Sequence, residues 1–191
     1  INSIVELIGN TPLIELNGFK ELSSDKRIFI KAEWFNPGGS IKDRAALYMI
    51  NDGITSKRLT SNKTIMDSSS GNTAIAYAMI GAALGFKVEL VTPENINVER
   101  KKTLQAYGAK IIYSSPFEGS DGAIIEARKL AKNFSDKYFM PDQYNNNANP
   151  DAHYKTTGPE IWEQTNHEIT HFISGIGTSG TAMGTSKFLK E

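Results

Sequence analysis

From residue 64 onward, short apolar runs alternate with longer segments of helical periodicity. Gly85 and Gly108 each stand where one of the longer segments ends, and a glycine commonly closes a helix. The two glycines are one β-α repeat apart, so the pattern predicts right-handed βαβ units on a parallel sheet. The predicted strands are residues 64–67, 87–92 and 110–113, and the predicted helices are residues 73–84 and 98–107.

The chain on either side of this block is less regular. Four asparagines between residues 145 and 150 give a composition that favours a linker. A mostly helical segment follows at residues 151–165, and Gly158-Pro159 is expected to break it. The other predicted elements are a polar loop at 17–26, strands at 28–33, 138–140 and 169–174, a helix that ends near residue 53, and helices at 122–134 and 181–191.

The stretch 36–44 connects the predicted strand at 28–33 to the next helix through a tight turn with one proline and two glycines. Ser40 is a predicted N-cap with Asp43 as its capping-box partner. Lys42 would then lie beside the positive end of the helix dipole, where a cation is disfavoured. A neutral amine can form a Schiff base with a carbonyl, although a solvated surface lysine fits the same residues. Arg44 is expected to fix the start of the helix.

Two further turns are candidate anion sites. Residues 177–181 (Gly-Thr-Ser-Gly-Thr) join a predicted strand to a helix and offer backbone N–H groups and hydroxyls to a phosphate, although tight packing explains these glycines equally well. They lack the Gly-Lys-Ser/Thr of a Walker loop. Residues 69–73 (Ser-Ser-Gly-Asn-Thr) are a second anion site or an N-capping serine cluster. Both turns follow predicted parallel strands, where α/β folds bind ligands.

Composition narrows the classes of protein and site. The chain has 191 residues, of which 39% are hydrophobic and 22% charged, as in an ordinary globular protein. Basic and acidic side chains balance at 21 each without a polybasic run, so we expect neither nucleic acid nor a membrane as a partner. The absence of cysteine excludes disulfides and thiolate sites. No metal site is expected, because His153, His167 and His171 show no clear ligand spacing.

Four ordered blocks resemble the pyridoxal-phosphate cysteine synthase family, which includes cystathionine β-synthase. They are residues 8–13, 36–44, 69–73 and 177–181, and the resemblance runs over essentially the whole chain. The resemblance implies an α/β fold with two open parallel-sheet domains of the tryptophan-synthase-β-like type, called fold type II.

The resemblance also implies a domain organisation. Residues 1–39 and 143–191 would belong to the large cofactor-binding domain, and residues 40–142 would form the small mobile α/β domain. Because family members continue well past residue 191, the chain is expected to be the N-terminal part of a longer enzyme whose large domain is incomplete.

The family's functional residues can be carried over position by position. Lys42 would hold pyridoxal 5′-phosphate as a Schiff base and act as the catalytic base, and Asn72 would bind the cofactor's ring hydroxyl. Ser69 and Ala74 stand where the family usually has threonine and glycine, which leaves the substrate preference open. The implied phosphate site is Gly177, Thr178, Ser179, Gly180 and Thr181, and the implied site for the substrate carboxylate is Ser69, Ser70, Gly71, Thr73 and Gln143.

The implied reaction is a β-replacement on an O-activated serine, either O-acetylserine or O-phosphoserine, with sulfide. It would give L-cysteine through an aminoacrylate intermediate. The sequences around 94–107 and 175–189 favour cysteine synthase B-type and phosphoserine-using members. Two alternatives stay open: a cystathionine β-synthase that uses homocysteine, and a catalytically incomplete fragment that serves as a binding module. The resemblance further implies a homodimer, docking of the C-terminal peptide of a serine acetyltransferase, and a cytoplasmic location.

Overall fold

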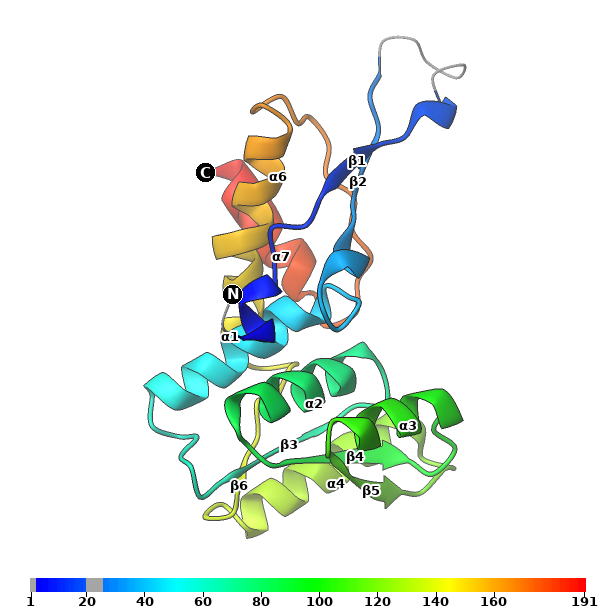
Figure 1. Cartoon of the computed structure of the whole chain (residues 1–191), viewed down its shortest axis with the longest axis vertical. Coiled ribbons are helices and arrows are strands. Elements are labelled where there is room, and N and C mark those ends of the chain that lie inside the picture. The colour runs from blue at the N-terminus through cyan, green and yellow to red at the C-terminus, as the bar shows by residue number, and fades with distance from the viewer. Residues whose placement is uncertain (1–2, 20–25) are drawn as a thin grey trace.

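The computed structural model describes residues 3–19 and 26–191, which form a helix-covered parallel sheet and, beside it, a cluster of helices (Figure 1). The four strands of the sheet are all parallel and follow the order β5-β4-β3-β6. This confirms the predicted α/β class and its βαβ repeat. The strands are β3 (Thr64–Ser68), β4 (Val88–Pro93), β5 (Lys110–Ser114) and β6 (Tyr138–Phe139).

The two faces of the sheet are covered by different helices. The chain moves outward from β3 to β5 through α2 and α3, and then returns to β6 through α4. Because crossovers between parallel strands are right-handed, this reversal puts α4 on the face opposite α2 and α3 (Figure 1). The helices are α2 (Asn72–Leu84), α3 (Val98–Ala106) and α4 (Gly119–Asn133).

Successive residues of the central strands point to opposite faces and so build two apolar cores. Ile65 and Leu90 enter the core beneath α2, whereas Met66 and Val91 enter the core beneath α4. Gly85 ends α2 with φ of 77°, the left-handed conformation that the sequence predicts for it.

The second cluster brings together segments that are far apart in the sequence. Helix α1 runs between the two parts of the molecule and packs against α2 on one side and α5 on the other (Figure 1). The elements of this cluster are the antiparallel pair β1 (Leu13–Glu15) and β2 (Phe29–Lys31), α1 (Lys42–Thr55), α5 (Ala148–Ala152), a π-helix (His153–Thr157), α6 (Gly158–Gln164), α7 (Gly180–Lys190), and 3₁₀-helices at Ile4–Leu7, Asn17–Phe19 and Glu33–Phe35.

Three predictions for this cluster are wrong. Residues 145–150 are not a linker, because α5 begins within them and Asn149 is buried. Gly158-Pro159 does not break the helix, because α5, the π-helix and α6 follow one another without a gap and Gly158 keeps helical backbone angles. Residues 169–174 form no strand, because no other strand in the described ranges runs alongside them to share hydrogen bonds.

Two other predictions are only partly met. The strand predicted at 28–33 ends at Lys31, and a 3₁₀-helix follows it. The loop predicted at 17–26 starts as a 3₁₀-helix, and residues 20–25 lie outside the described residues. Within the part of the chain that the structure describes, no helix has the length and apolar character needed to cross a bilayer.

Close packing of α7 on α5 and the π-helix depends on Gly184. A Cβ at this position would collide with the backbone oxygen of Pro150 and lie 2.9 Å from the Cβ of His153. We therefore expect Gly184→Ala to lower the free energy of unfolding by about 1–3 kcal/mol, although alanine is normally the better helix residue. The matched control is Gly175→Ala, which adds a methyl group in open space. Equal thermal stabilities of the two variants would contradict this packing.

Candidate active site

Lys42 is the first residue of α1. Ser40 was predicted to be its N-cap, but the N-cap is Ile41, one residue later. Ser40 still helps to start the helix, because its Oγ accepts the backbone N–H of Lys42 at 3.2 Å. The second half of the predicted capping box is wrong, because the Asp43 carboxylate accepts the N–H of Gly38 at 2.6 Å and does not reach back to Ser40. A Cβ on Gly38 would collide with that carboxylate, so this glycine lets the turn fold tightly onto the helix.

The side chain of Lys42 is half-buried, and burial lowers the pKa of its amine. Among the described residues, no carboxylate forms an ion pair with it that would favour the charged form. A larger fraction of the amine is therefore neutral than for a solvated lysine, and the neutral form is the nucleophile and the base.

Arg44, two residues after Lys42, is buried and holds two carboxylates. Its guanidinium donates to both oxygens of Glu33 at 2.8 and 2.9 Å, and to both oxygens of Glu160 at 2.6 and 2.7 Å. Lys31 Nζ also donates to Glu160, at 2.6 Å, so two positive and two negative side chains balance. These contacts connect α1, the segment after β2, and α6. They give Arg44 a structural role at the start of the helix.

The charged forms of this group depend on one another. Burial alone would raise the pKa of Glu160, but hydrogen bonds from Arg44 and Lys31 outweigh it and hold the pKa at about 2. Burial likewise would raise the pKa of Glu33, which hydrogen bonds from Arg44 bring below its usual value. Both carboxylates are therefore ionised at neutral pH and need Arg44 as their counter-charge.

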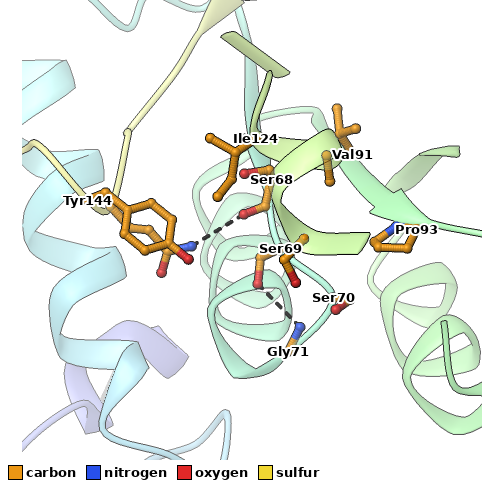
Figure 2. Close-up of a pocket in the computed structure, with 11 residues that line it drawn as sticks. Ser68, Ser69, Ser70, Gly71, Val91, Pro93, Ile124 and Tyr144 are labelled. Atoms are coloured by element: carbon orange, nitrogen blue, oxygen red, sulfur yellow. Dashed lines mark hydrogen bonds between the residues drawn. The ribbon is translucent and has the colours of Figure 1, made fainter. Parts of the chain in front are cut away.

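The loop between β3 and α2 carries most of the predicted substrate residues. Ser69 Oγ accepts the backbone N–H groups of Gly71, at 3.3 Å, and of Ala74, at 3.2 Å, so it closes the loop onto the start of α2 (Figure 2). The carbonyl of Ser70 accepts a hydrogen bond from the guanidinium of an arginine in α3, at 3.3 Å. The side chain of Asn72 is exposed and makes no hydrogen bond to the described residues, so its amide is free for a ligand.

Gln143 follows β6, the strand next to β3, and joins this loop from there. The Thr73 hydroxyl donates to Gln143 Oε1 at 2.9 Å, and Gln143 Nε2 donates to the carbonyl of Ser68 at 3.3 Å. Each of these three residues is buried. The structure thus brings two of the predicted substrate residues, 70 positions apart in the chain, into direct contact.

Gln143, Ser68 and the loop residues 69–71 help to line a cavity of about 130 Å³ at the carboxyl ends of β3 and β4 (Figure 2). One part of its wall is polar and comes from Ser68, Ser69 and Ser70, while Ile124 and Tyr144 form an apolar part. The hydroxyl of Ser68 is buried and has no hydrogen-bond partner among residues 3–19 and 26–191. The cavity therefore offers both polar and apolar surface to a small molecule.

Asp67, which the sequence analysis did not single out, lies directly beneath the loop. Its carboxylate accepts the N–H of Ser68 at 2.8 Å and the hydroxyl of Tyr77 at 3.0 Å. Burial raises the pKa of Asp67 to about 6. In the sequence, Asp67 could have been noticed as the single acidic residue of a strand that is otherwise buried.

The predicted phosphate residues form the start of α7. Ser179 has φ of 63° and precedes Gly180, the first helical residue, so the helix N-terminus with its free N–H groups opens at this turn. Asn149 Nδ2 donates to Thr178 Oγ1 at 2.8 Å and to the carbonyl of Gln143 at 2.9 Å. A Cβ on Gly180 would collide with the Asn149 side chain, so this glycine is required for the contact.

Asn149 therefore connects the two predicted sites, and the sequence analysis missed it because it read the asparagine run as a linker. The hydrogen-bonded line runs from Thr73 through Gln143 and Asn149 to Thr178. No group of three or more histidine and acidic side chains in the described ranges is arranged to hold a metal ion.

A sequence model of the family described as "Pyridoxal-phosphate dependent enzyme" matches residues 4–191. The chain belongs to this family. Its curated relatives include the cysteine synthase of Aquifex aeolicus, 50% identical over 190 residues, and the cysteine synthase B of Salmonella typhimurium, 43% identical over 193 residues. The alignments cover 98% and 100% of this chain, but 58% and 62% of those proteins. The chain thus spans less than two thirds of their length.

Solved structures agree with this membership in the pyridoxal-phosphate-dependent family. The crystal structure of cysteine synthase from Entamoeba histolytica superimposes with a TM-score of 0.94 and 40% sequence identity, covering 100% of this chain and 57% of that one. The predicted family resemblance and the predicted fold class are therefore confirmed.

Removing Arg44 tests the charged group that supports α1 in this family member. We expect Arg44→Met to lower the free energy of unfolding by about 3–5 kcal/mol at pH 7, because the partly buried Glu33 loses its counter-charge and Glu160 keeps only Lys31. The matched control, Arg58→Met, breaks an exposed ion pair with Asp52 and should cost less than about 1 kcal/mol.

The loss of stability expected in Arg44→Met should depend on pH. The pKa of Glu160 is lower in the folded than in the unfolded chain, so its stabilisation is complete above about pH 4.5 and is lost as the pH falls towards 2. Urea unfolding at pH 7 and pH 3 should therefore show a smaller difference between wild type and Arg44→Met at pH 3. A difference that does not depend on pH would mean that packing, not charge, explains the effect.

Proposed function

We propose that this chain carries cofactor-binding and substrate-binding parts of a cysteine synthase, which replaces the activated hydroxyl of an O-acetylated or O-phosphorylated serine by sulfide. The observation that carries the proposal is the hydrogen-bonded line from the buried Thr73 through Gln143 and Asn149 to the half-buried Thr178. This line joins a small-molecule cavity to a helix N-terminus suited to phosphate. The names of the relatives at 43–50% identity support the same activity.

The described residues fit pyridoxal 5′-phosphate. Lys42 presents a half-buried amine that has a lowered pKa and no counter-ion in the described part of the chain, as a Schiff-base lysine requires. Asn72 offers a free amide for the ring hydroxyl. Bound there, the cofactor supplies the electron sink for chemistry at the substrate's Cα and Cβ. The phosphate would be held by Gly177, Thr178, Ser179, Gly180 and Thr181.

The substrate's carboxylate would be held by the loop and by Gln143. One proton of Gln143 Nε2 is donated to the carbonyl of Ser68, and the second proton is left for a ligand. Ser69, Ser70, Gly71 and Thr73 complete this binding site at the start of α2, where an anion is favoured. Closure of the loop would exclude water and orient the Cα–H bond towards Lys42, whose neutral amine accepts that proton.

The remaining parts of the proposal rest on the resemblance alone. They are the division into a mobile domain at 40–142 and a large domain at 1–39 and 143–191, the homodimer, the serine acetyltransferase peptide and the cytoplasmic location.

Visible absorbance of the complete protein with pyridoxal 5′-phosphate tests the cofactor assignment. We expect a bound-cofactor band that is lost in Lys42→Ala and kept in Lys155→Ala, which removes an exposed lysine. Adding O-acetylserine or O-phosphoserine should change the band, and the more effective compound identifies the leaving group. Product formation with sulfide, rather than homocysteine, then separates cysteine synthase from cystathionine β-synthase. A wild-type protein without any band would contradict the proposal.

Steady-state kinetics test the role of Gln143. Because a hydrogen bond to a charged group contributes about 1.5–3 kcal/mol, we expect Gln143→Leu to lower kcat/KM for the amino-acid substrate by about ten- to hundredfold. The cofactor band should persist. The control is Gln105→Leu at an exposed position of α3, which should leave kcat/KM unchanged. Wild-type kinetics in Gln143→Leu would remove this residue from the site.

A further inference from the structure

The two threonines of the predicted phosphate loop each have a buried polar side chain directly behind them. Asn149 lies behind Thr178 at 2.8 Å, and His153 Nε2 lies behind Thr181 at 3.3 Å. Asn149 and His153 are 3% and 2% exposed and lie four residues apart, on the segment where α5 continues into the π-helix. This arrangement has consequences for the direction of each hydrogen bond.

The direction of the first bond follows from the contacts of Asn149. Its Nδ2 lies within hydrogen-bond distance of both the Gln143 carbonyl and Thr178 Oγ1. A backbone carbonyl only accepts, which fixes the amide nitrogen on this side, and an amide nitrogen only donates. Thr178 Oγ must therefore accept from Asn149, and its own hydroxyl proton is left for another acceptor.

The second bond depends on the tautomer of His153. Burial lowers the pKa of this imidazole to about 4, so the ring is neutral and carries one proton. Its Nδ1 lies 2.9 Å from the hydroxyl of the buried Thr157, and its Nε2 faces Thr181. If the proton is on Nε2, Thr157 donates to Nδ1 and the Thr181 hydroxyl is free to donate. With the proton on Nδ1, the Thr181 hydroxyl donates back to the ring.

We propose that Asn149 and His153 are positioning residues that turn the hydroxyls of Thr178 and Thr181 into donors aimed at the phosphate group of the ligand. This inference rests on the proposed function, in which that loop holds a phosphate. A phosphate dianion accepts hydrogen bonds and has no proton to donate. Hydroxyls that already accept a hydrogen bond from the protein keep their own proton for the ligand, so a loop of such hydroxyls favours a dianion. The line Thr157–His153–Thr181 carries this orientation from the protein interior to the loop.

The tautomer of His153 is the first test. The complete protein is labelled with [¹⁵N]histidine, and nitrogen spectra are recorded with pyridoxal 5′-phosphate bound. The chain has three histidines, and the signals of His153 are those missing in His153→Gln. We expect a protonated Nε2 and an unprotonated Nδ1. A protonated Nδ1, or an imidazolium at neutral pH, would overturn the proposal.

Two variants separate hydrogen bonding from packing. Glutamine places a donor near the position of Nε2, so His153→Gln should change the dissociation constant of pyridoxal 5′-phosphate by less than about threefold. His153→Leu has no donor and should raise it about tenfold, with a shift of the bound ³¹P resonance. His171→Leu, at an exposed histidine, is the matched control and should change neither. Equal losses in the Gln and Leu variants would show that His153 only fills space.

A double-mutant cycle tests whether His153 acts through Thr181. Thr181→Val removes the hydroxyl and keeps the shape, so His153→Leu should have little further effect on affinity in that background. The same cycle with Asn149→Leu and Thr178→Val tests the other pair. Additive effects would overturn the inference.

The experiments also distinguish this inference from the proposed function. If the wild-type protein binds no pyridoxal 5′-phosphate, the proposed function fails, and the tautomer is then measured with inorganic phosphate as the probe. Nε2 protonation with phosphate would still support the inference, and Nδ1 protonation would reject it.

Discussion

The pairing of Arg44 with two carboxylates is the contact on which the rest of the site depends. Glu33 follows strand β2, Glu160 lies in α6, and Arg44 stands two residues after Lys42 on α1. Three separate parts of the chain therefore meet at one buried guanidinium. Because a buried charge without a partner is costly, these parts have one arrangement in which all four charges are satisfied. That arrangement also fixes where the amine of Lys42 emerges.

The regular half of the fold was predictable because local rules and tertiary packing agree there. The strand and helix spacing from residue 64 to 113 and the closing glycine Gly85 all appear as the sequence indicates. The segment at 169–174 fails for the opposite reason. Its apolar residues suit a strand, but a strand also needs a neighbour, and composition alone does not supply one.

Much of the site geometry could not be predicted, because it depends on contacts distant in sequence. Asn149 reads as part of a polar linker until its amide is seen between Gln143 and Thr178. His153 was considered only as a metal ligand, and its role in the fold is set by two hydroxyls on different helices. The spacing of a capping box predicted Ser40 as the partner of Asp43. The turn folds back instead, so that the Asp43 carboxylate accepts the N–H of Gly38.

The π-helix at His153–Thr157 changes the direction in which the side chains after it point. Each residue of an α-helix advances the side-chain direction by about 100°, and a wider turn absorbs an additional residue without ending the helix. This offset allows His153 to face α7 while Glu160, seven residues later, faces Arg44. A one-residue deletion here would rotate α6 relative to α5, so that either the imidazole or the carboxylate would point away from its partner. The additional residue of the π-helix therefore sets the angle between the side chain that contacts the ligand loop and the side chain that contacts Arg44.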